Sequence, residues 1–317
     1  MNMRFSVLIP AYNATSTIAA TLDSVLAQTL PAHEILVYDD GSTDDTAAVL
    51  ATYGDRIRAF SEPNRGVAHA RNFLCSQATG EQVAFLDADD LWHPRYLEVQ
   101  RQLVERHPDA IASFTGHIDV VGMADFDWDD VDAGAPVAAD LIGPNDFLRR
   151  YNLTPMEFGM SWFCMSTAAL RRLGATPFYD GGAEDAYLHN TLPLLGPVVH
   201  TPTRLATYRI LDGSLSSDRL WSSTKVIDAF RELAPRYEDA ASRDLLRSFG
   251  AISASRKRDC GKFLMGAGRP KDARGHFLDS ITDSARPDSV LKSVSLLALS
   301  MMPRPLQPAW PTVGRLG

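Results

Sequence analysis

The chain has 317 residues, 45% of them hydrophobic and 22% charged, which are ordinary globular values and exclude wholesale disorder. This length predicts a large core and more than one substructure. The formal net charge of −8 argues against a nucleic-acid-binding surface, which would need a basic excess, and is compatible with a protein that handles anions through a metal and a few arginines.

The three cysteines, Cys75, Cys164 and Cys260, lie far apart and form neither a C-x-x-C pair nor a zinc spacing. A reducing cytoplasm is therefore the expected compartment. The first residues enter directly into a short apolar run, which leaves no room for a signal peptide. Since no run of about 18 apolar residues occurs, no membrane-spanning helix is expected.

Short apolar runs alternate with segments of helical spacing over the first 90 residues. The apolar runs, predicted as strands, are Phe5–Ile9 (ended by Pro10), Glu34–Tyr38, Ile57–Ser61 and Val83–Leu86. Helices are predicted between them, near residues 15–30, 44–53 and 67–78. Alternation every 25 residues or so predicts βαβ units and a parallel sheet with helices on both faces.

Polar or acidic side chains follow three of these strands. Tyr12 follows the first, Asp40 the second, and Asp87, Asp89 and Asp90 the fourth. Ligands of open parallel sheets bind outside the carboxyl ends of the strands, so these side chains are expected at one edge. Three carboxylates so close resist ionising together unless a cation such as Mg²⁺ or Mn²⁺ holds them. A solvated turn is the alternative interpretation of the acidic cluster.

Two nucleotide-binding motifs are absent. No G-x-G-x-x-G follows the first predicted strand, which removes the main support for a nicotinamide-binding fold. The chain also has no G-x-x-x-x-G-K-[ST], which excludes a P-loop nucleoside triphosphatase. Any bound nucleotide is therefore expected without a glycine-rich phosphate cradle.

The middle of the chain is less regular. We expect a helix over residues 92–107, a strand over 111–121 and a solvated acidic loop over 125–140. A further strand is predicted at Met160–Met165, and two short strands at 198–201 and 204–210. Glu184 and Asp185 begin a predicted helix. They either interact favourably with the helix dipole or take part in catalysis.

Beyond residue 216 the pattern is helical with no strand signal. The predicted helices are Thr224–Leu233, Ser242–Ser255, Arg258–Met265 and Pro270–Ile281. The apolar stretch Val290–Met302 is too short to span a membrane. It could lie on a membrane surface as an amphipathic segment, but packing on the core is favoured.

Five pieces in order resemble the family 2 glycosyltransferases of GT-A fold. They are residues 6–13 (SVLIPAYN), 34–44 (EILVYDDGSTD), 64–72 (NRGVAHARN), 85–90 (FLDADD) and 184–185 (ED). The resemblance covers the first two-thirds of the chain. It implies a mostly parallel α/β sheet flanked by helices over residues 1–216, with a nucleotide-sugar-binding half (1–110) and an acceptor-binding half (111–216), and a helical C-terminal appendage (217–317).

The resemblance also implies a reaction. A sugar would pass from a nucleoside-diphosphate sugar, with UDP-sugars favoured, to an acceptor hydroxyl with inversion at the sugar carbon. Mg²⁺ or Mn²⁺ would be the cofactor. The acceptor would be a glycan or a lipid-linked acceptor. The reaction would belong to bacterial cell-surface polysaccharide or glycoconjugate synthesis. The enzyme would act in the cytoplasm, with peripheral membrane contact through the C-terminal region.

The resemblance assigns roles residue by residue. Asp40 would accept a hydrogen bond from the nucleobase, Asp87 would contact the ribose and Asp89 the metal. Asp185 would be the base, with Glu184 beside it positioning the acceptor or the helix. Asp90 has no such role and is expected to cap the following helix. The remaining residues assigned to the donor are Pro10, Ala11, Tyr12, Asn13, Asn64, Gly66, Arg71, Ala88 and Arg209.

One departure from the family pattern stands at Leu211. Members often carry Tyr-Arg-x-His, whereas this chain has Tyr-Arg-Ile-Leu from residue 208. Arg209, Asp212, His200 or a water could take the place of that histidine. A catalytically weak relative that binds a nucleotide sugar or glycan is therefore a second hypothesis. A nucleotidyltransferase is a third, but the loop at residues 10–13 lacks the glycines and lysines it would need.

Overall fold

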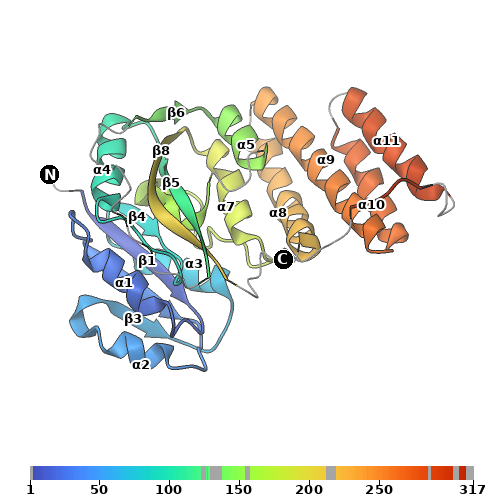
Figure 1. Ribbon diagram of the computed structural model, residues 1–317. Helices are drawn as coiled ribbons and strands as arrows, with labels where there is room; N and C mark the ends of the chain where they lie inside the picture. Colours follow the sequence, from blue (N-terminus) through green and yellow to red (C-terminus); the bar gives the residue numbers. More distant parts are fainter. Residues whose placement is uncertain are drawn as a thin grey trace. The chain divides into compact units, whose positions relative to one another are not determined.

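The computed structural model describes residues 3–122, 126, 128, 138–153, 158–211, 219–240, 242–284, 287–302 and 307–311. The chain divides into two compact units. Unit 1 comprises Met1–Asp180 and Leu195–Asp212, and unit 2 comprises Gly181–Leu194 and Gly213–Gly317. In Figure 1 the strands of unit 1 run from blue to yellow, and the long helices of unit 2 are orange and red.

The described residues of unit 1 form one eight-stranded sheet with the order β3-β2-β1-β4-β7-β5-β8-β6. Only the pairs made by β7 and β6 are antiparallel among the described strands. The carboxyl ends of β1 to β5 and β8 therefore meet at one edge. The strands are β1 (Phe5–Ala11), β2 (Glu34–Asp39), β3 (Arg58–Ser61), β4 (Gln82–Phe85), β5 (Ala112–Val121), β6 (Asp140–Ile142), β7 (Phe163–Ser166) and β8 (Val198–Ile210).

Helices cover this sheet, as the alternating pattern predicts. α3 packs on β1 and β2, and α4 packs on β5 and β8. The helices of unit 1 are α1 (Ile18–Leu26), α2 (Thr46–Ala51), α3 (Val67–Gln77), α4 (Tyr96–Arg106), α5 (Pro144–Leu153) and α6 (Thr167–Arg171). The predicted fold class, a mostly parallel α/β sheet with a helical C-terminal region, is confirmed.

A row of phenylalanines joins the parallel strands to the second half of the sheet. The ring of Phe85 on β4 stacks on Phe163 of β7, with 5.5 Å between centroids, and Phe163 stacks on Phe114 of β5 at 4.8 Å. Phe147 and Phe158 also pack on the ring of Phe114. All five side chains are buried. Such aromatic pairs add roughly 0.5–1.5 kcal/mol each beyond their burial, so they stabilise the strand order next to the β4 end.

The prediction that Pro10 ends the first strand is wrong. β1 continues to Ala11, and Pro10 is in register with Tyr38. The backbone groups of Leu8 face β4, where Leu8 accepts a hydrogen bond from Leu86, while those of Ala11 face β2. Successive residues alternate sides, so Pro10 faces the β4 side, where the β1–β4 pairing has already ended at Leu8. A residue without an N–H is tolerated there.

Other boundaries in unit 1 also differ from the predictions. The helix after β4 begins at Tyr96 rather than at Trp92, because Trp92 instead forms a bridge with Ala206 of β8. The two strands predicted at 198–201 and 204–210 are one strand, β8, with register shifts near Gly116. Most of the acidic stretch lies outside the described residues, and Asp140 begins β6.

Unit 2 is built from helices, with no strand among its described residues. The hydroxyl of Tyr237 on α8 donates to the carbonyl of Asn190 on α7 at 2.6 Å, and its ring stacks on Phe249 of α9 at 3.9 Å. Residues 256–257, where a break was predicted, are inside α9, and Lys257 pairs with Asp283. The helices are α7 (Glu184–Thr191), α8 (Arg219–Ala240), α9 (Arg243–Gly266), α10 (Pro270–Thr282) and α11 (Pro287–Met301).

Within the described ranges, no helix combines the length and the apolar character needed to cross a membrane. The bounds of the two compact units differ from the predicted domain division, because residues 181–194 group with the later helices. Unit 2 therefore includes the Glu184-Asp185 pair.

We predict a pH-dependent contribution of Glu34 to stability. Burial would raise the pKa of this carboxyl, but hydrogen bonds from Ser6 and Thr79 outweigh it and lower the pKa below its ordinary value. A lowered folded-state pKa stabilises the protein above the unfolded-state pKa, and this stabilisation is lost as the pH falls through the folded-state value. Glu34→Gln should therefore cost about 1–2 kcal/mol at pH 7 and much less once the pH has fallen through the lowered folded-state value, measured by chemical unfolding.

Glu105→Gln is the matched control. Glu105 pairs with Arg101 on the exposed surface of α4, so its loss should cost about 0.5 kcal/mol or less at either pH. An equal, pH-independent loss in both variants would contradict the role given to Glu34.

Candidate functional site

The loops that follow β1 and β2 are bound to each other. The Asn13 side-chain oxygen accepts from the Thr43 N–H at 2.8 Å, and the Asn13 N–H donates to Ser42 Oγ at 2.9 Å. Asp44 accepts from the Thr15 N–H at 3.1 Å. Asn13 has a positive φ of 49°, which asparagine tolerates better than most residues. These bonds place the two strand ends in a fixed relation at the sheet edge.

A third segment, the loop before α3, is held by Asp40. The two carboxylate oxygens of this buried residue accept from the N–H groups of Arg65 and Gly66, each at 2.8 Å. Gly41 follows with φ of +73°, and a Cβ there would lie 2.6 Å from the nitrogen of Asn64. Any side chain at position 41 would therefore separate the loops.

Aromatic and small residues border the end of β1. Pro10 and Ala11 are buried in the strand, whereas the ring of Tyr12 is 52% exposed just beyond it. The ring of Tyr38, one strand over, is buried, and its hydroxyl donates to Glu62 at 3.1 Å. Tyr12 is thus an exposed aromatic face beside the polar loops.

The three carboxylates after β4 have different environments. Asp87 forms an ion pair with Arg71 at 2.6 Å, and the Arg71 guanidinium, which is buried on α3, also lies over the ring of Phe178. Burial and the nearby charge of Asp87 raise the pKa of Asp89 to about 6. Asp89 is therefore harder to ionise than an exposed aspartate, and a nearby cation would favour its charged form.

Asp90 is buried and connects segments far apart in the chain. It accepts hydrogen bonds from the Ser161 hydroxyl and, at 2.8 Å, from the N–H of Arg209 at the end of β8. Ser161 Oγ in turn accepts from the Asp87 N–H at 3.1 Å. The prediction that Asp90 caps the next helix is wrong, because α4 begins only at Tyr96.

The structure brings the predicted donor residues of unit 1 to the carboxyl edge of the sheet. They come from the ends of β1, β2, β4 and β8 and from the start of α3: Pro10, Ala11, Tyr12, Asn13, Asp40, Asn64, Gly66, Arg71, Asp87, Ala88, Asp89 and Arg209. Glu184 and Asp185 lie in unit 2, half-buried in the first turn of α7, where Asp185 accepts from the N–H of Ala186 at 2.6 Å. Asp212 lies outside the described residues.

Two residues of the edge were missed from the sequence. Ser161 lies in a short helical turn before β7, and Thr207 Oγ1 on β8 accepts from the Leu91 N–H at 2.8 Å. Both contact the 87–92 segment from more than 70 residues away. A lone serine or threonine carries no sequence signal for such a contact.

The donor set at the β4 end suits a divalent cation shared with a ligand. The described residues contain no group of three or more histidine, cysteine or acidic side chains arranged to hold a metal. Mg²⁺ and Mn²⁺ sites of nucleotide enzymes use one or two carboxylates and complete the coordination with phosphate and water. Asp89, with Asp87 beside it and its pKa raised, fits that kind of site.

Comparisons with known proteins identify the family of the chain. The family model described as Glycosyl transferase family 2 matches residues 6–173, more than half of the chain. A curated relative from Escherichia coli, the UDP-Glc:alpha-D-GlcNAc-diphosphoundecaprenol beta-1,3-glucosyltransferase WfgD, is 43% identical over 97 residues, which are 30% of this chain and 38% of the relative. The first curated relatives are matched over less than half of their own length.

Two solved structures share the fold. TarS residues 1–349 of S. aureus, in complex with UDP-GlcNAc, matches with a TM-score of 0.68 and 19% identity over 94% of this chain and 90% of that one. The mannosyltransferase PcManGT of Pyrobaculum calidifontis, in complex with GDP-Man and Mn²⁺, matches with a TM-score of 0.59 and 19% identity over 96% and 82%. At this identity the likeness concerns the fold alone.

We predict that Asp90 stabilises the edge through its two contacts. Asp90→Ala leaves the buried Arg209 N–H without this acceptor and should destabilise unit 1 by about 2–4 kcal/mol. Asp90→Asn keeps an oxygen of the same shape and should cost less than half as much. Thermal unfolding of the two variants and the wild type measures this difference in stability. Equal destabilisation by both variants would contradict the hydrogen-bonding role.

Proposed function

The chain belongs to glycosyl transferase family 2, and we propose that it transfers a sugar from a nucleoside-diphosphate sugar to an acceptor hydroxyl with inversion at the sugar carbon. The observation that carries the proposal is the gathering of Tyr12, Asp40 and Asp89 at one edge of the sheet. This edge offers an aromatic face, a carboxylate acceptor and a candidate metal ligand, which are what a nucleotide diphosphate requires.

The nucleobase would lie against Pro10, Ala11 and Tyr12. Asp40 would accept a hydrogen bond from the base. Although each of its oxygens already takes one backbone N–H, a carboxylate has about four lone-pair sites, so capacity is left. Asn64 and Gly66, in the loop that Asp40 holds, would complete this side of the nucleotide site.

The ribose and diphosphate would lie toward β4 and β8. Asp87 would contact the ribose, with its orientation fixed by Arg71. Arg71 and Arg209 would supply positive charge to the phosphates. A UDP-sugar is the favoured donor, which is supported by the donor in the WfgD name and the ligand in the TarS complex. PcManGT, in contrast, is in complex with GDP-Man, so the nucleobase of the donor is to be determined by experiment.

Asp89 would hold Mg²⁺ or Mn²⁺ together with the diphosphate. When bound, such a cation offsets the negative charge that builds on the leaving diphosphate. Asp87 would orient the donor next to the cation. Asp90 positions the segment that carries Asp87 and Asp89. The Mn²⁺ in the PcManGT complex supports a metal requirement.

The acceptor hydroxyl would attack the anomeric carbon of the donor sugar. As the new carbon–oxygen bond forms, the bond to the diphosphate oxygen breaks, and the nucleoside diphosphate leaves with the electron pair. Asp185 would take the hydroxyl proton, and Glu184 would position the acceptor or the start of α7. A base on the face opposite the leaving group gives inversion.

The acceptor is proposed to be a glycan or a lipid-linked saccharide, in bacterial cell-surface polysaccharide synthesis. The diphosphoundecaprenol acceptor in the name of WfgD supports this class. Residues 1–110 would form the donor half and 111–216 the acceptor half, with 217–317 as a helical appendage. The three unpaired cysteines support action in the cytoplasm.

We predict a metal-dependent donor response. In a panel of UDP-, GDP- and dTDP-sugars with Mn²⁺, the donor should raise the melting temperature, because a ligand at a hundredfold excess over its Kd stabilises by about 2.7 kcal/mol. Calorimetry should then show that removing Mn²⁺, or introducing Asp89→Ala, weakens donor binding at least about tenfold. Asp109→Ala, on an exposed turn, is the control and should bind as wild type does.

The experiment tests the metal assignment and the donor class independently. Donor affinity that is unchanged by Asp89→Ala and by loss of Mn²⁺ would remove the metal assignment. If no nucleotide sugar in the panel shifts the melting temperature, the proposed donor class is wrong.

The base is tested by Asp185→Asn. We expect transfer to fall by about 10³-fold or more, since a neutral amide cannot accept the proton, while donor affinity stays within about twofold. Product formation by mass spectrometry and donor binding by calorimetry measure the two effects. Retained transfer would exclude Asp185 as the base, whereas donor binding without transfer in the wild type would favour the catalytically weak relative suggested by Leu211.

A further inference from the structure

Asn72 is the last residue of the 64–72 motif and has no part in the proposed chemistry. It lies on α3 directly after Arg71 and is half-buried. Its side-chain amide forms two hydrogen bonds with the backbone of Phe178. Nδ2 donates to the Phe178 carbonyl at 2.8 Å, and Oδ1 accepts from the Phe178 N–H at 2.9 Å. One side chain therefore pairs both backbone groups of a residue 106 positions away.

The loop that contains Phe178 depends on this contact. Residues 174–183 contain no helix or strand, although the Phe178 side chain is only 1% exposed. Buried backbone N–H and carbonyl groups need hydrogen-bond partners, and no ladder of a sheet supplies them here. An asparagine amide carries donors and an acceptor at the end of one short side chain, which matches the two groups of a single residue. Asn72 thus fixes where the Phe178 ring lies.

The Phe178 ring contacts two groups of the candidate site. Its centroid is 5.7 Å from Cζ of Arg71, whose guanidinium lies over the ring. It also makes an edge-to-face contact with Phe85, with 5.5 Å between the ring centroids. Phe85 is the last residue of β4, two residues before Asp87. One ring therefore contacts both the guanidinium that pairs with Asp87 and the strand that Asp87 follows.

The burial of Arg71 makes the ring contact important for its direction. The Arg71 side chain is 5% exposed, so protein groups and not water determine where the guanidinium points. Asp87 pairs with it at 2.6 Å, and the face of the Phe178 ring lies against it. An aromatic face attracts a guanidinium more strongly where water is excluded. Without the ring, the guanidinium has room to turn away from Asp87.

A loop-closing role for Asn72 is the simpler interpretation of its two hydrogen bonds. The arrangement on α3 favours a further role. Arg71 and Asn72 are consecutive, so their side chains leave the helix about 100° apart. Both nevertheless contact Phe178, Arg71 through the ring and Asn72 through the backbone. Asn72 holds the residue on which Arg71 packs.

We propose that Asn72 and Phe178 are positioning residues for the nucleoside-diphosphate part of the donor. Asn72 fixes the ring, and the ring holds Arg71 toward Asp87 and the diphosphate. The inference rests on the proposed function, because it takes Arg71 and Asp87 as donor contacts. It adds the loop at residues 174–180 to the parts of unit 1 on which donor affinity depends.

Calorimetry of the full chain with Mn²⁺ and either UDP or GDP, whichever the wild type binds, tests the proposal. Phe178→Leu keeps a buried apolar side chain but removes the aromatic face, and should raise the Kd at least about fivefold. Asn72→Ala should raise it at least about threefold, because the ring is no longer fixed before the ligand binds. Circular dichroism shows that each variant is folded.

The same substitutions in an Arg71→Met background separate positioning from a purely structural effect. If Phe178 and Asn72 act through Arg71, their replacement in this background should change the Kd by less than about twofold. A structural effect would instead weaken binding by the same factor with and without Arg71.

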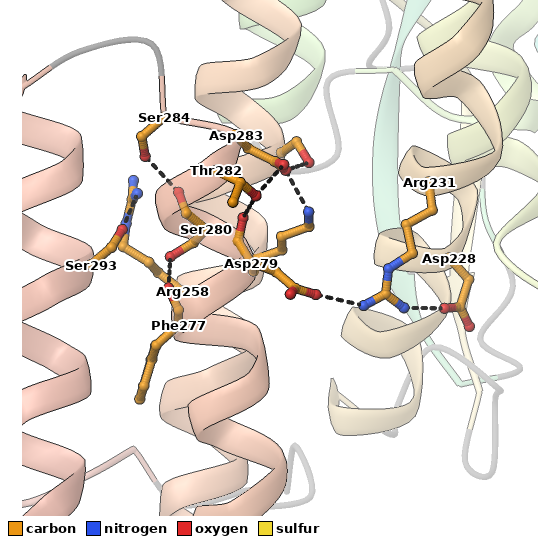
Figure 2. A network of polar contacts seen from close by, with 12 residues as sticks. Asp228, Arg231, Arg258, Phe277, Asp279, Ser280, Thr282, Asp283, Ser284 and Ser293 are labelled. Carbon is orange, nitrogen blue, oxygen red and sulfur yellow. Dashed lines mark hydrogen bonds and ion pairs between the residues drawn. The ribbon is translucent and has the colours of Figure 1, made fainter.

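Arg258→Ala is the matched control for lost hydrogen bonds. Arg258 on α9 donates to the hydroxyls of Ser289 and Ser293 on α11, at 2.9 and 3.2 Å, and Figure 2 shows it reaching Ser293. Like Asn72, it joins two segments through two hydrogen bonds, but it does so within unit 2. Its loss should lower the melting temperature and leave the Kd unchanged.

Three results would overturn the proposal. The first is a Phe178→Leu variant that binds as tightly as the wild type does. The second is an equal loss of affinity in the wild-type and Arg71→Met backgrounds. Both leave the proposed function intact. The third is a wild type that binds neither UDP nor GDP with Mn²⁺, which would overturn the proposed function as well.

Discussion

The candidate site depends on how unit 1 accommodates three carboxylates in four residues. Asp87, Asp89 and Asp90 follow a buried strand, where like charges are costly. Arg71 offsets the charge of Asp87. Asp90 is buried, its pKa is raised well above the usual range by burial and by Asp89, and it accepts bonds from Ser161 and Arg209. Asp89 is the carboxyl whose charge a bound cation would stabilise.

The same contacts connect stability to the proposed chemistry. Asp40 holds the loop before α3, and Asp90 holds the β4 end against β8, so two buried carboxyls position the segments that would contact the donor. Gly41 lets those loops approach closely. The side chains proposed to meet the ligand, Tyr12 and Asp89, project from loops that these contacts have already fixed. Preorganisation of this kind lowers the cost of ordering on binding.

The fold and the position of the candidate site at the carboxyl edge of the sheet can be predicted from the sequence, because local patterns indicate both. Alternating strands and helices imply parallel strand ends, and each acidic pair directly follows its strand. The role of Asp90 could not be predicted, since its partners Ser161 and Arg209 lie 71 and 119 residues away. β6 has three residues and too little pattern to recognise. The contact of Arg258 on α9 with Ser289 of α11 joins two helices and likewise has no local sequence signal.

Hydrogen–deuterium exchange with and without the donor and Mn²⁺ tests the central claim, that the carboxyl edge of the sheet binds the nucleotide sugar. Protection is expected in peptides that cover residues 10–14, 39–42, 64–72 and 87–92, where backbone amides border the site, with little change in α10 and α11. A donor that binds while these four segments exchange as in the free protein would contradict the account.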